Sequence, residues 1–239
     1  MTRCCRPRAR GSAALCFAVL AVASPAVGEP PEPAAAAQRP EPARRLDIGP
    51  HLGLAARRAK GDGIRYDPSF AWGAHVRLEL ASFLGLRLSW KSARHAVSVK
   101  DGALGLPGAD DPPPIDLYTL GARLEPTLAL GSRARLFAGV GVAWGRASEA
   151  GWSVAHTLIP ERTGVMLELP EFALGASFEL VPHWLDAGAV GSAAAVGNES
   201  GELFEARPVV GPSGSRASVA ALPEVSSAYS GMLWVSLVR

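Results

Sequence analysis

The chain has 239 residues, of which 48% are hydrophobic and 19% charged, and its formal net charge is +2. This length suits one domain, and the nearly balanced charge gives no support to a nucleic-acid partner. All three cysteines lie among the first sixteen residues, which excludes a disulfide framework, a thiol nucleophile or a cysteine metal site from the rest of the chain.

Residues 1–28 have the composition of an export signal. The opening "MTRCCRPRAR" contains four arginines and no acidic residue, and the apolar run "GSAALCFAVLAVA" follows it. Small residues at 21–23 and 26–28 offer sites for signal peptidase, so we predict a secretory signal peptide over 1–28. Without this segment 20 Lys and Arg face 22 Asp and Glu, a net charge near −2.

The next segment, residues 29–44, reads "EPPEPAAAAQRPEPAR". It is rich in proline, alanine and glutamate and has too few large apolar residues to bury a core. We therefore expect a disordered or extended tether here, followed by one folded domain over 45–239.

Strict alternation of apolar with polar or small residues marks the domain, as in "FAWGAHVRLEL" at 70–80. Side chains alternate faces along a β-strand, so each such segment has one apolar face and one polar face. The segment 184–196 is rich in alanine and glycine and gives the weakest signal. The eight predicted strands are 45–56, 70–80, 83–91, 116–130, 135–145, 171–180, 184–196 and 228–238.

The connections between these strands alternate between short and long. Short links fall at 81–83, 131–134 and 181–183, and long ones at 57–69, 100–115, 147–164 and 197–227. Three tight turns at one end and four long loops at the other are typical of a bacterial outer-membrane barrel. The pattern predicts an all-β fold, an eight-stranded antiparallel up-and-down transmembrane β-barrel with short periplasmic turns.

Aromatic residues on the apolar face gather near the long-loop ends of the strands. Such a distribution is typical of an aromatic girdle at a membrane interface. The predicted girdle residues are Trp72, Trp90, Tyr118, Trp144 and Tyr229.

The opposite face of the strands is charged, with glycines interspersed among the long side chains. In a small barrel this face points inward, so we expect these side chains to pair across the lumen. The predicted lumen network comprises His51, His75, Arg77, Glu79, Arg87, Lys91, Arg123, Glu125, Glu171 and Glu179.

Motifs for catalysis or cofactor binding are weak. The five histidines show neither an HxH nor an HExxH spacing, and "GVGVAWG" lacks the helix that follows a nucleotide-binding loop. Ser92 and His95, near the loop end of one strand, are the best candidates for a catalytic pair. We expect no enzyme activity, no cofactor and no metal.

In architecture residues 45–239 resemble the small eight-stranded bacterial outer-membrane barrels, the OmpA-barrel and OmpX-like superfamily. The resemblance rests on the export signal, the alternating strands, the loop asymmetry and the girdle. It implies a Gram-negative outer-membrane location, contact with outer-membrane lipid and lipopolysaccharide, and insertion by the barrel-assembly machinery. Members commonly end on an aromatic residue, whereas this chain ends "LWVSLVR", so Trp234 is the candidate to replace it.

A barrel of eight strands has room for little more than its own side chains. We therefore expect a structural or surface-interaction protein with a side-chain-filled lumen, its long loops 100–115 and 197–227 meeting an extracellular ligand. Two alternatives remain open from the sequence. One is a narrow outer-membrane pore, and the other is a soluble periplasmic lipocalin-like carrier with its apolar face turned inward.

Overall fold

The structure, a computed structural model, describes residues 45–61, 63–100, 102–106, 112–154, 156–211, 214 and 216–239. The predicted signal peptide at 1–28 and tether at 29–44 lie outside the described residues.

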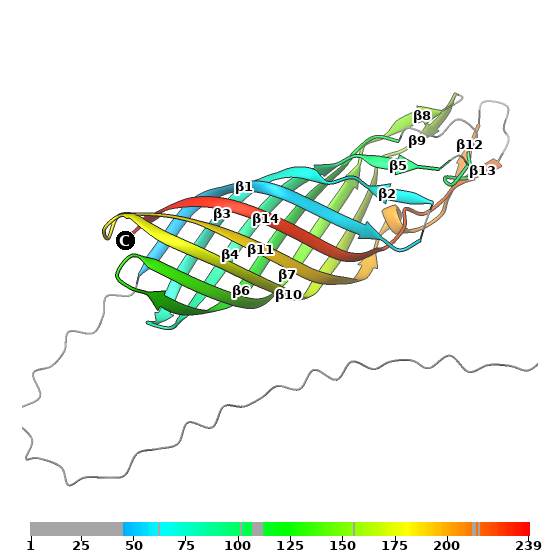
Figure 1. Ribbon diagram of the computed structural model, residues 1–239. Coiled ribbons are helices and arrows are strands. Elements are labelled where there is room, and N and C mark those ends of the chain that lie inside the picture. Colours follow the sequence, from blue (N-terminus) through cyan, green and yellow to red (C-terminus); the bar gives the residue numbers. More distant parts are fainter. Residues whose placement is uncertain are drawn as a thin grey trace, which may run out of the picture. The chain divides into compact units, whose positions relative to one another are not determined.

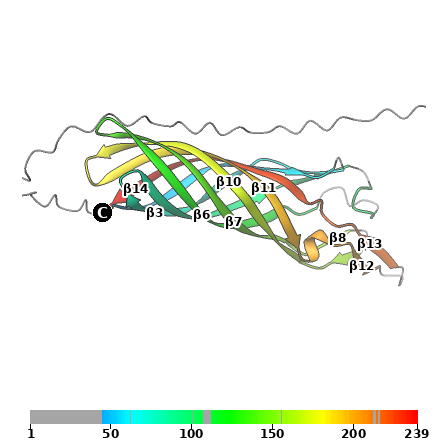
Figure 2. The ribbon, with the colours of Figure 1, turned by 90° about the horizontal axis from the view of Figure 1, so that it is seen from below.

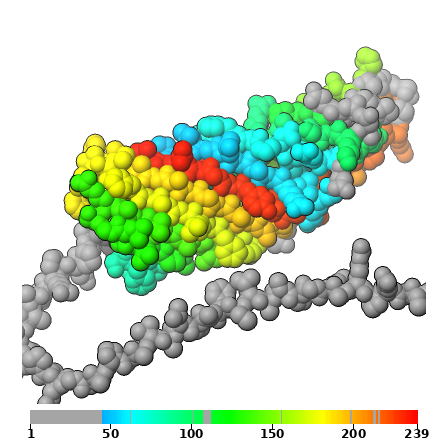
Figure 3. All heavy atoms as spheres, viewed as in Figure 1, coloured from blue at the N-terminus to red at the C-terminus, as the bar shows by residue number. Residues whose placement is uncertain are grey.

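The described residues form a closed antiparallel barrel of eight long strands (Figure 1). Around the barrel the order is β1-β14-β11-β10-β7-β6-β4-β3, so the first and last strands pair and no edge remains. In Figure 3 the red side chains of β14 lie directly against the blue and cyan ones of the first strands. The predicted fold class is confirmed. The strands are β1 (Leu46–Ala59), β3 (Ser69–Ala81), β4 (Leu84–His95), β6 (Ile115–Leu130), β7 (Ala134–Glu149), β10 (Arg162–Val181), β11 (Leu185–Ser200) and β14 (Val225–Val238).

Several strands extend further toward the long loops than their sequence pattern predicts. The segment expected at 83–91 reaches His95, and the one expected at 171–180 begins at Arg162. Backbone pairing with neighbouring strands continues there although the side-chain alternation weakens, because the hydrogen bonds of a ladder do not depend on side-chain type. The weak segment at 184–196 likewise forms a full strand, β11, paired on both sides by β10 and β14.

A β-bulge in β10 explains why the alternation breaks at Pro170. Glu168 lies opposite Ala143 and Glu171 lies opposite Gly141, so Leu169 and Pro170 together face one residue of β7. A bulge leaves the extra residue outside the ladder, where the missing N–H of proline costs no hydrogen bond. As a result both glutamates, three residues apart, point into the barrel and are buried.

The outer face of the barrel is apolar and the inner face is charged. Leu52, Trp72 and Leu174 are 53%, 52% and 70% exposed, whereas Arg87 and Glu125 are buried in the interior. A soluble protein rarely leaves so large a continuous apolar surface in water, and an outer-membrane barrel requires one. The protein is thus a transmembrane barrel of the bacterial outer membrane. A lipocalin-like carrier needs an apolar inner face and a polar outer face, which is the reverse of what this barrel has.

No helix among the described residues is both long enough and apolar enough to span a membrane.

The long loops are not simple connections. At the end of the barrel opposite the C-terminus they form short strands and one 3₁₀ turn (Figures 1 and 2). Strands β2 and β5 come from two different loops and pair with each other. We call these elements, with the described residues between them, the cap. They are β2 (Ile64–Tyr66), β5 (Val97–Val99), β8 (Trp152–Val154), β9 (Thr157–Ile159), η1 (Glu202–Phe204), β12 (Arg207–Val210) and β13 (Arg216–Val219).

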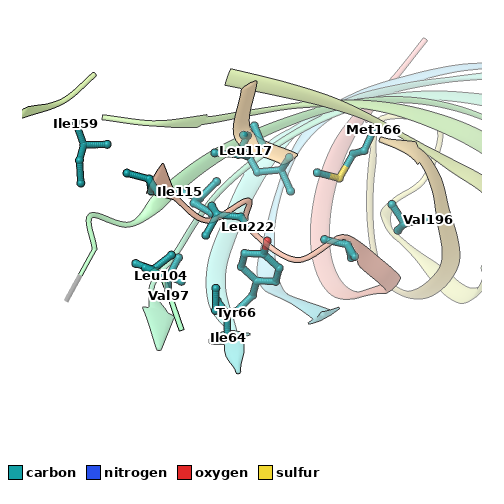
Figure 4. Packing of buried hydrophobic residues seen from close by; sticks show 14 of the residues in the cluster. Ile64, Tyr66, Val97, Leu104, Ile115, Leu117, Ile159, Met166, Val196 and Leu222 are labelled. Carbon is teal, nitrogen blue, oxygen red and sulfur yellow. The ribbon is translucent and has the colours of Figure 1, made fainter. Parts of the chain in front are cut away.

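The cap shares one hydrophobic core with the adjoining ends of the barrel strands (Figure 4). Leu104, Leu203 and Leu222 are almost completely buried in it, beside Leu117 of β6 and Met166 of β10. Alternation along the sequence does not reveal these elements because each of the short strands is only three or four residues long. Their stability comes from packing between loops that are distant in sequence.

Gly73 of β3 offers a test of how tightly the barrel wall is packed. A Cβ on this residue would lie 1.9 Å from the carbonyl oxygen of Trp90 and 2.6 Å from Nε2 of His51. Replacing Gly73 with alanine should therefore destabilise the barrel by about 1–3 kcal/mol, because the backbone has to move. Urea unfolding in lipid vesicles, followed by the gel mobility of unboiled samples, measures the change. A Cβ on Gly191 meets no atom within 4 Å, so equal losses for both alanine variants would contradict this account.

Candidate functional site

The lumen contains three arginines arranged around one glutamate. Arg77, Arg87 and Arg123 lie directly opposite one another on β3, β4 and β6. Glu125, on the same inward face of β6 as Arg123, is completely buried and pairs with all three. Its carboxylate oxygens lie 3.2 Å from Nε of Arg77, 2.8 Å from Nε of Arg87 and 2.8 Å from Nη2 of Arg123. One carboxylate thus holds three like charges together across neighbouring strands.

Two further carboxylates balance this cluster on either side. Asp47 of β1 lies 3.4 Å from Nη1 of Arg77. Glu171 of β10 lies 3.4 Å from Nη1 of Arg123 and 3.6 Å from Nζ of Lys91. Buried charges in a low-dielectric interior are tolerated when they are paired in this way.

Further ion pairs lie on either side of this cluster along the barrel. Toward the short-turn end, Arg45 binds Asp47 at 2.8 Å and also pairs with Asp186 of β11. Toward the cap, Arg57 of β1 lies 2.5 Å from Glu168. The lumen is therefore occupied by paired charges along much of its length.

A fully buried ion pair joins the barrel to the cap. Nε of Arg162 lies 2.6 Å from Glu149, and neither side chain is exposed. Nη1 of Arg162 also donates to the carbonyl oxygen of Ala220, at 3.1 Å. This contact ties strands β7 and β10 to the segment between β13 and β14.

An aromatic and histidine cluster fills the lumen beside the arginines. Trp234 of β14 points inward and is 4% exposed. Its ring lies 5.2 Å from that of His75 and 5.2 Å from the guanidinium carbon of Arg87, and His51 stacks on His75 at 5.8 Å. Because Tyr229 and Leu233 of β14 face outward, the alternation turns Trp234 to the lumen. Its side chain therefore belongs to the lumen cluster, and its suggested role as a substitute for a terminal aromatic stays a prediction.

The remaining two residues of the predicted lumen network lie near the short-turn end. Nη1 of Arg135 lies 3.5 Å from Glu79, and both side chains are partly exposed. Glu179 accepts a hydrogen bond from the backbone N–H of His183 in the turn. Neither glutamate therefore takes part in the buried cluster around Glu125.

Sequence reasoning missed several members of the lumen network. Arg57, Glu149 and Arg162 fall outside the predicted strands, and Asp186 lies in the weak segment. Arg57, Glu149 and Asp186 follow the inward parity of their strands, so extending the alternation by a few residues would have found them. Arg162 lies beyond the bulge at Leu169 and Pro170, which reverses the parity, so the alternation of 171–180 could not have found it.

All five predicted girdle residues lie on the outer face, three to five residues from the cap end of their strands. Four are 45–52% exposed, and Trp90 is half-buried because Trp72 packs edge-on against it, with ring centroids 4.9 Å apart.

Buried titratable groups at the base of the cap favour their neutral forms. Burial lowers the pKa of His95, whose Nδ1 lies 3.0 Å from the carbonyl oxygen of Asp67. Burial also raises the pKa of Tyr66, which donates to the carbonyl oxygen of Pro223 at 2.8 Å, and that of Glu199.

The structure does not bring Ser92 and His95 together as a catalytic pair. Ser92 lies beside Trp72 and Tyr118 on the outer face of β4, whereas His95 points inward and is buried. Among the described residues, no three His, Cys, Asp or Glu side chains gather in a way that could hold a metal ion.

A scan against protein-family models finds no match, and a search of the curated proteins finds none either. Solved structures do match, at low sequence identity. Neisserial surface protein A (NspA) is 14% identical, with 82% of this chain and 95% of that chain covered and a TM-score of 0.45. Ail, the attachment invasion locus protein of Yersinia pestis, is 16% identical, with 82% and 98% covered and a TM-score of 0.43. A major outer membrane protein from Thermus thermophilus is 14% identical, with 82% and 100% covered and a TM-score of 0.48.

Glu125 should contribute far more to stability than other acidic residues of the network. Replacing Glu125 with glutamine leaves three buried arginines without their shared carboxylate, so we expect a loss of about 3–5 kcal/mol. Glu79→Gln is the matched control, since its ion pair is partly exposed and should contribute at most about 1 kcal/mol. Urea unfolding in vesicles compares the two variants, and similar midpoints for both would refute the central role of Glu125.

Proposed function

We propose that the protein is a surface-interaction protein of the outer membrane, whose filled barrel anchors an ordered extracellular cap. The observation that carries this proposal is the cap itself, which has a continuous hydrophobic core and covers the end of a lumen occupied by ion pairs. In this proposal the five girdle aromatics mark the outer membrane interface. Residues 1–28 direct export, the barrel-assembly machinery inserts the chain, and the protein catalyses no reaction.

The interior of the barrel supports a closed lumen rather than a narrow pore. Two cavities are lined by lumen side chains, one next to Arg57 and Glu168 and the other next to Arg87 and Trp234. Each has a volume of about 20 Å³, which is room for roughly one water molecule. Ion flow would require the paired charges between and around these cavities to separate.

The outer surface of the cap supports a role in contact with another protein. Leu158 of β9 and Val210 of β12 are 71% and 65% exposed, and these two strands pack against each other. These two strands lie at the end of the barrel opposite the short turns (Figure 1). These exposed apolar side chains lie on ordered strands and are available to a partner protein. We therefore assign the contact surface to β9 and to β12, which belongs to the expected loop 197–227, whereas Leu104 of loop 100–115 and Leu203 of loop 197–227 are buried within the cap.

Conductance measurements test the closed lumen. The full-length protein reconstituted in planar bilayers should show no stepwise current, because the ion pairs and the cap core occupy the path. A porin of known conductance in the same bilayers verifies the sensitivity. Reproducible single-channel steps from this protein would favour the pore instead.

Cysteine labelling tests which end of the barrel faces the medium. Leu158→Cys should react with a membrane-impermeant maleimide on intact cells, because its side chain is exposed on the cap. His183→Cys is the matched control at the opposite end, where the side chain of His183 is 96% exposed. It should react only after the outer membrane is broken, and the wild-type chain serves as the blank. Labelling of His183→Cys but not Leu158→Cys on intact cells would reverse the orientation.

A further inference from the structure

A groove crosses the outer face of the barrel between two of its tryptophans. It has a volume of about 590 Å³ and an almost entirely apolar lining. One row of outward side chains across it runs Ala74, Trp90, Leu120 and Trp144 on β3, β4, β6 and β7. In the adjacent row Ala122 lies between Leu88 and Val142. The two small alanines beside bulky neighbours leave the surface hollow at this place.

The cap-side edge of the groove carries polar groups. On β7 the next outward residue after Trp144 is Arg146, and on β6 the next after Leu120 is Tyr118. Arg146 and Tyr118 are direct partners in the register, and Ser92 of β4 is the partner of Tyr118 on its other side. Adjacent strands lie about 4.8 Å apart, so a guanidinium, a phenol and a hydroxyl share one small patch.

Arg146 is available to an outside ligand. Its side chain is exposed and forms no ion pair with any residue that the structure describes, whereas the nearby Arg94 lies 3.7 Å from Asp116. Being two residues beyond Trp144, Arg146 lies at the level where the apolar belt gives way to the cap. A cation at that level is suited to the phosphate of a lipid headgroup.

We propose that this groove binds one phosphorylated glycolipid of the outer leaflet, of the lipid A type. An acyl chain lies in the groove over Ala74 and Ala122, between Trp90 and Trp144. A phosphate of the headgroup accepts hydrogen bonds from Arg146 and Tyr118. The choice of an outer-leaflet lipid rests on the proposed function, since it requires the cap to face the medium.

A second groove on the barrel provides an internal control. It has a similar volume, about 580 Å³, and lies over β10, β11 and β14, where Ala176, Gly191 and Gly231 form its floor. The next outward residues toward the cap are Phe172, Ala193 and Tyr229, none of which carries a positive charge. Among the described residues, the three that follow the floor of this second groove toward the cap therefore provide no cation to fix a headgroup.

Native mass spectrometry of the detergent-solubilised full-length protein, titrated with lipid A, tests the proposal. We expect one lipid A molecule to bind, and Arg146→Gln to weaken binding about tenfold or more, equivalent to about 1.4 kcal/mol. Ala122→Phe, which fills the groove, should weaken binding similarly, and Gly191→Phe, which fills the second groove, should leave it unchanged. The mobility shift of unboiled samples verifies that each variant is folded.

Two further titrations distinguish the ligand chemistry. Lipid A without its phosphates should bind the wild type as weakly as lipid A binds Arg146→Gln. The site is refuted if lipid A without phosphates binds the wild type as tightly as lipid A does. It is also refuted if Arg146→Gln and Ala122→Phe bind lipid A as tightly as the wild type does. Phosphatidylglycerol that binds as tightly as lipid A would overturn the assignment to the outer leaflet. None of these results depends on the cysteine labelling, so the proposed orientation of the barrel and the proposed lipid site can be refuted independently.

Discussion

The arrangement of Arg77, Arg87 and Arg123 around Glu125 is the interaction on which the rest of the barrel depends. Three guanidinium groups on adjacent strands repel one another unless a carboxylate lies among them. Glu125 is held at that place by the pairing of β6 with β4, and Asp47 and Glu171 complete the balance from β1 and β10. Because these residues come from five strands, the charges can pair only when the barrel is closed in one register.

The lipid environment makes that closure compulsory. Strands in a bilayer must satisfy every backbone N–H and C=O group within the protein, and a closed barrel does so without an edge. With the apolar faces turned to lipid, the polar faces share a narrow interior where each charge needs a partner. The bulge at Leu169 and Pro170 fits this requirement, since it brings both Glu168 and Glu171 inside.

The two surfaces to which we assign binding differ in the physical chemistry they offer. The cap presents exposed apolar side chains to the medium, on strands held by a buried core and by the pair of Arg162 and Glu149. The groove instead offers an apolar slot within the membrane next to a cation at its boundary. A rigid barrel supports both, because its filled interior prevents the strands from shifting.

The alternation of apolar and polar residues along each strand determined much of the fold of this protein. The period of two along each strand specified which residues face outward, so the number of long strands, the outward aromatics and the inward charges could be predicted from the residues alone. The same period places Trp234 on the inward face of β14, opposite to Tyr229 and Leu233.

The tertiary structure decided what depends on register between strands. Nothing in the sequence states that Arg57 meets Glu168, that β2 pairs with β5 from another loop, or that Ala74 and Ala122 lie in neighbouring rows of one groove. These contacts join residues distant along the chain, and a shift by one residue on one strand would change the contacts that this strand makes. Alternation is a property of one strand, whereas pairing, the cap and the grooves belong to several strands at once, which is why only the folded barrel reveals them.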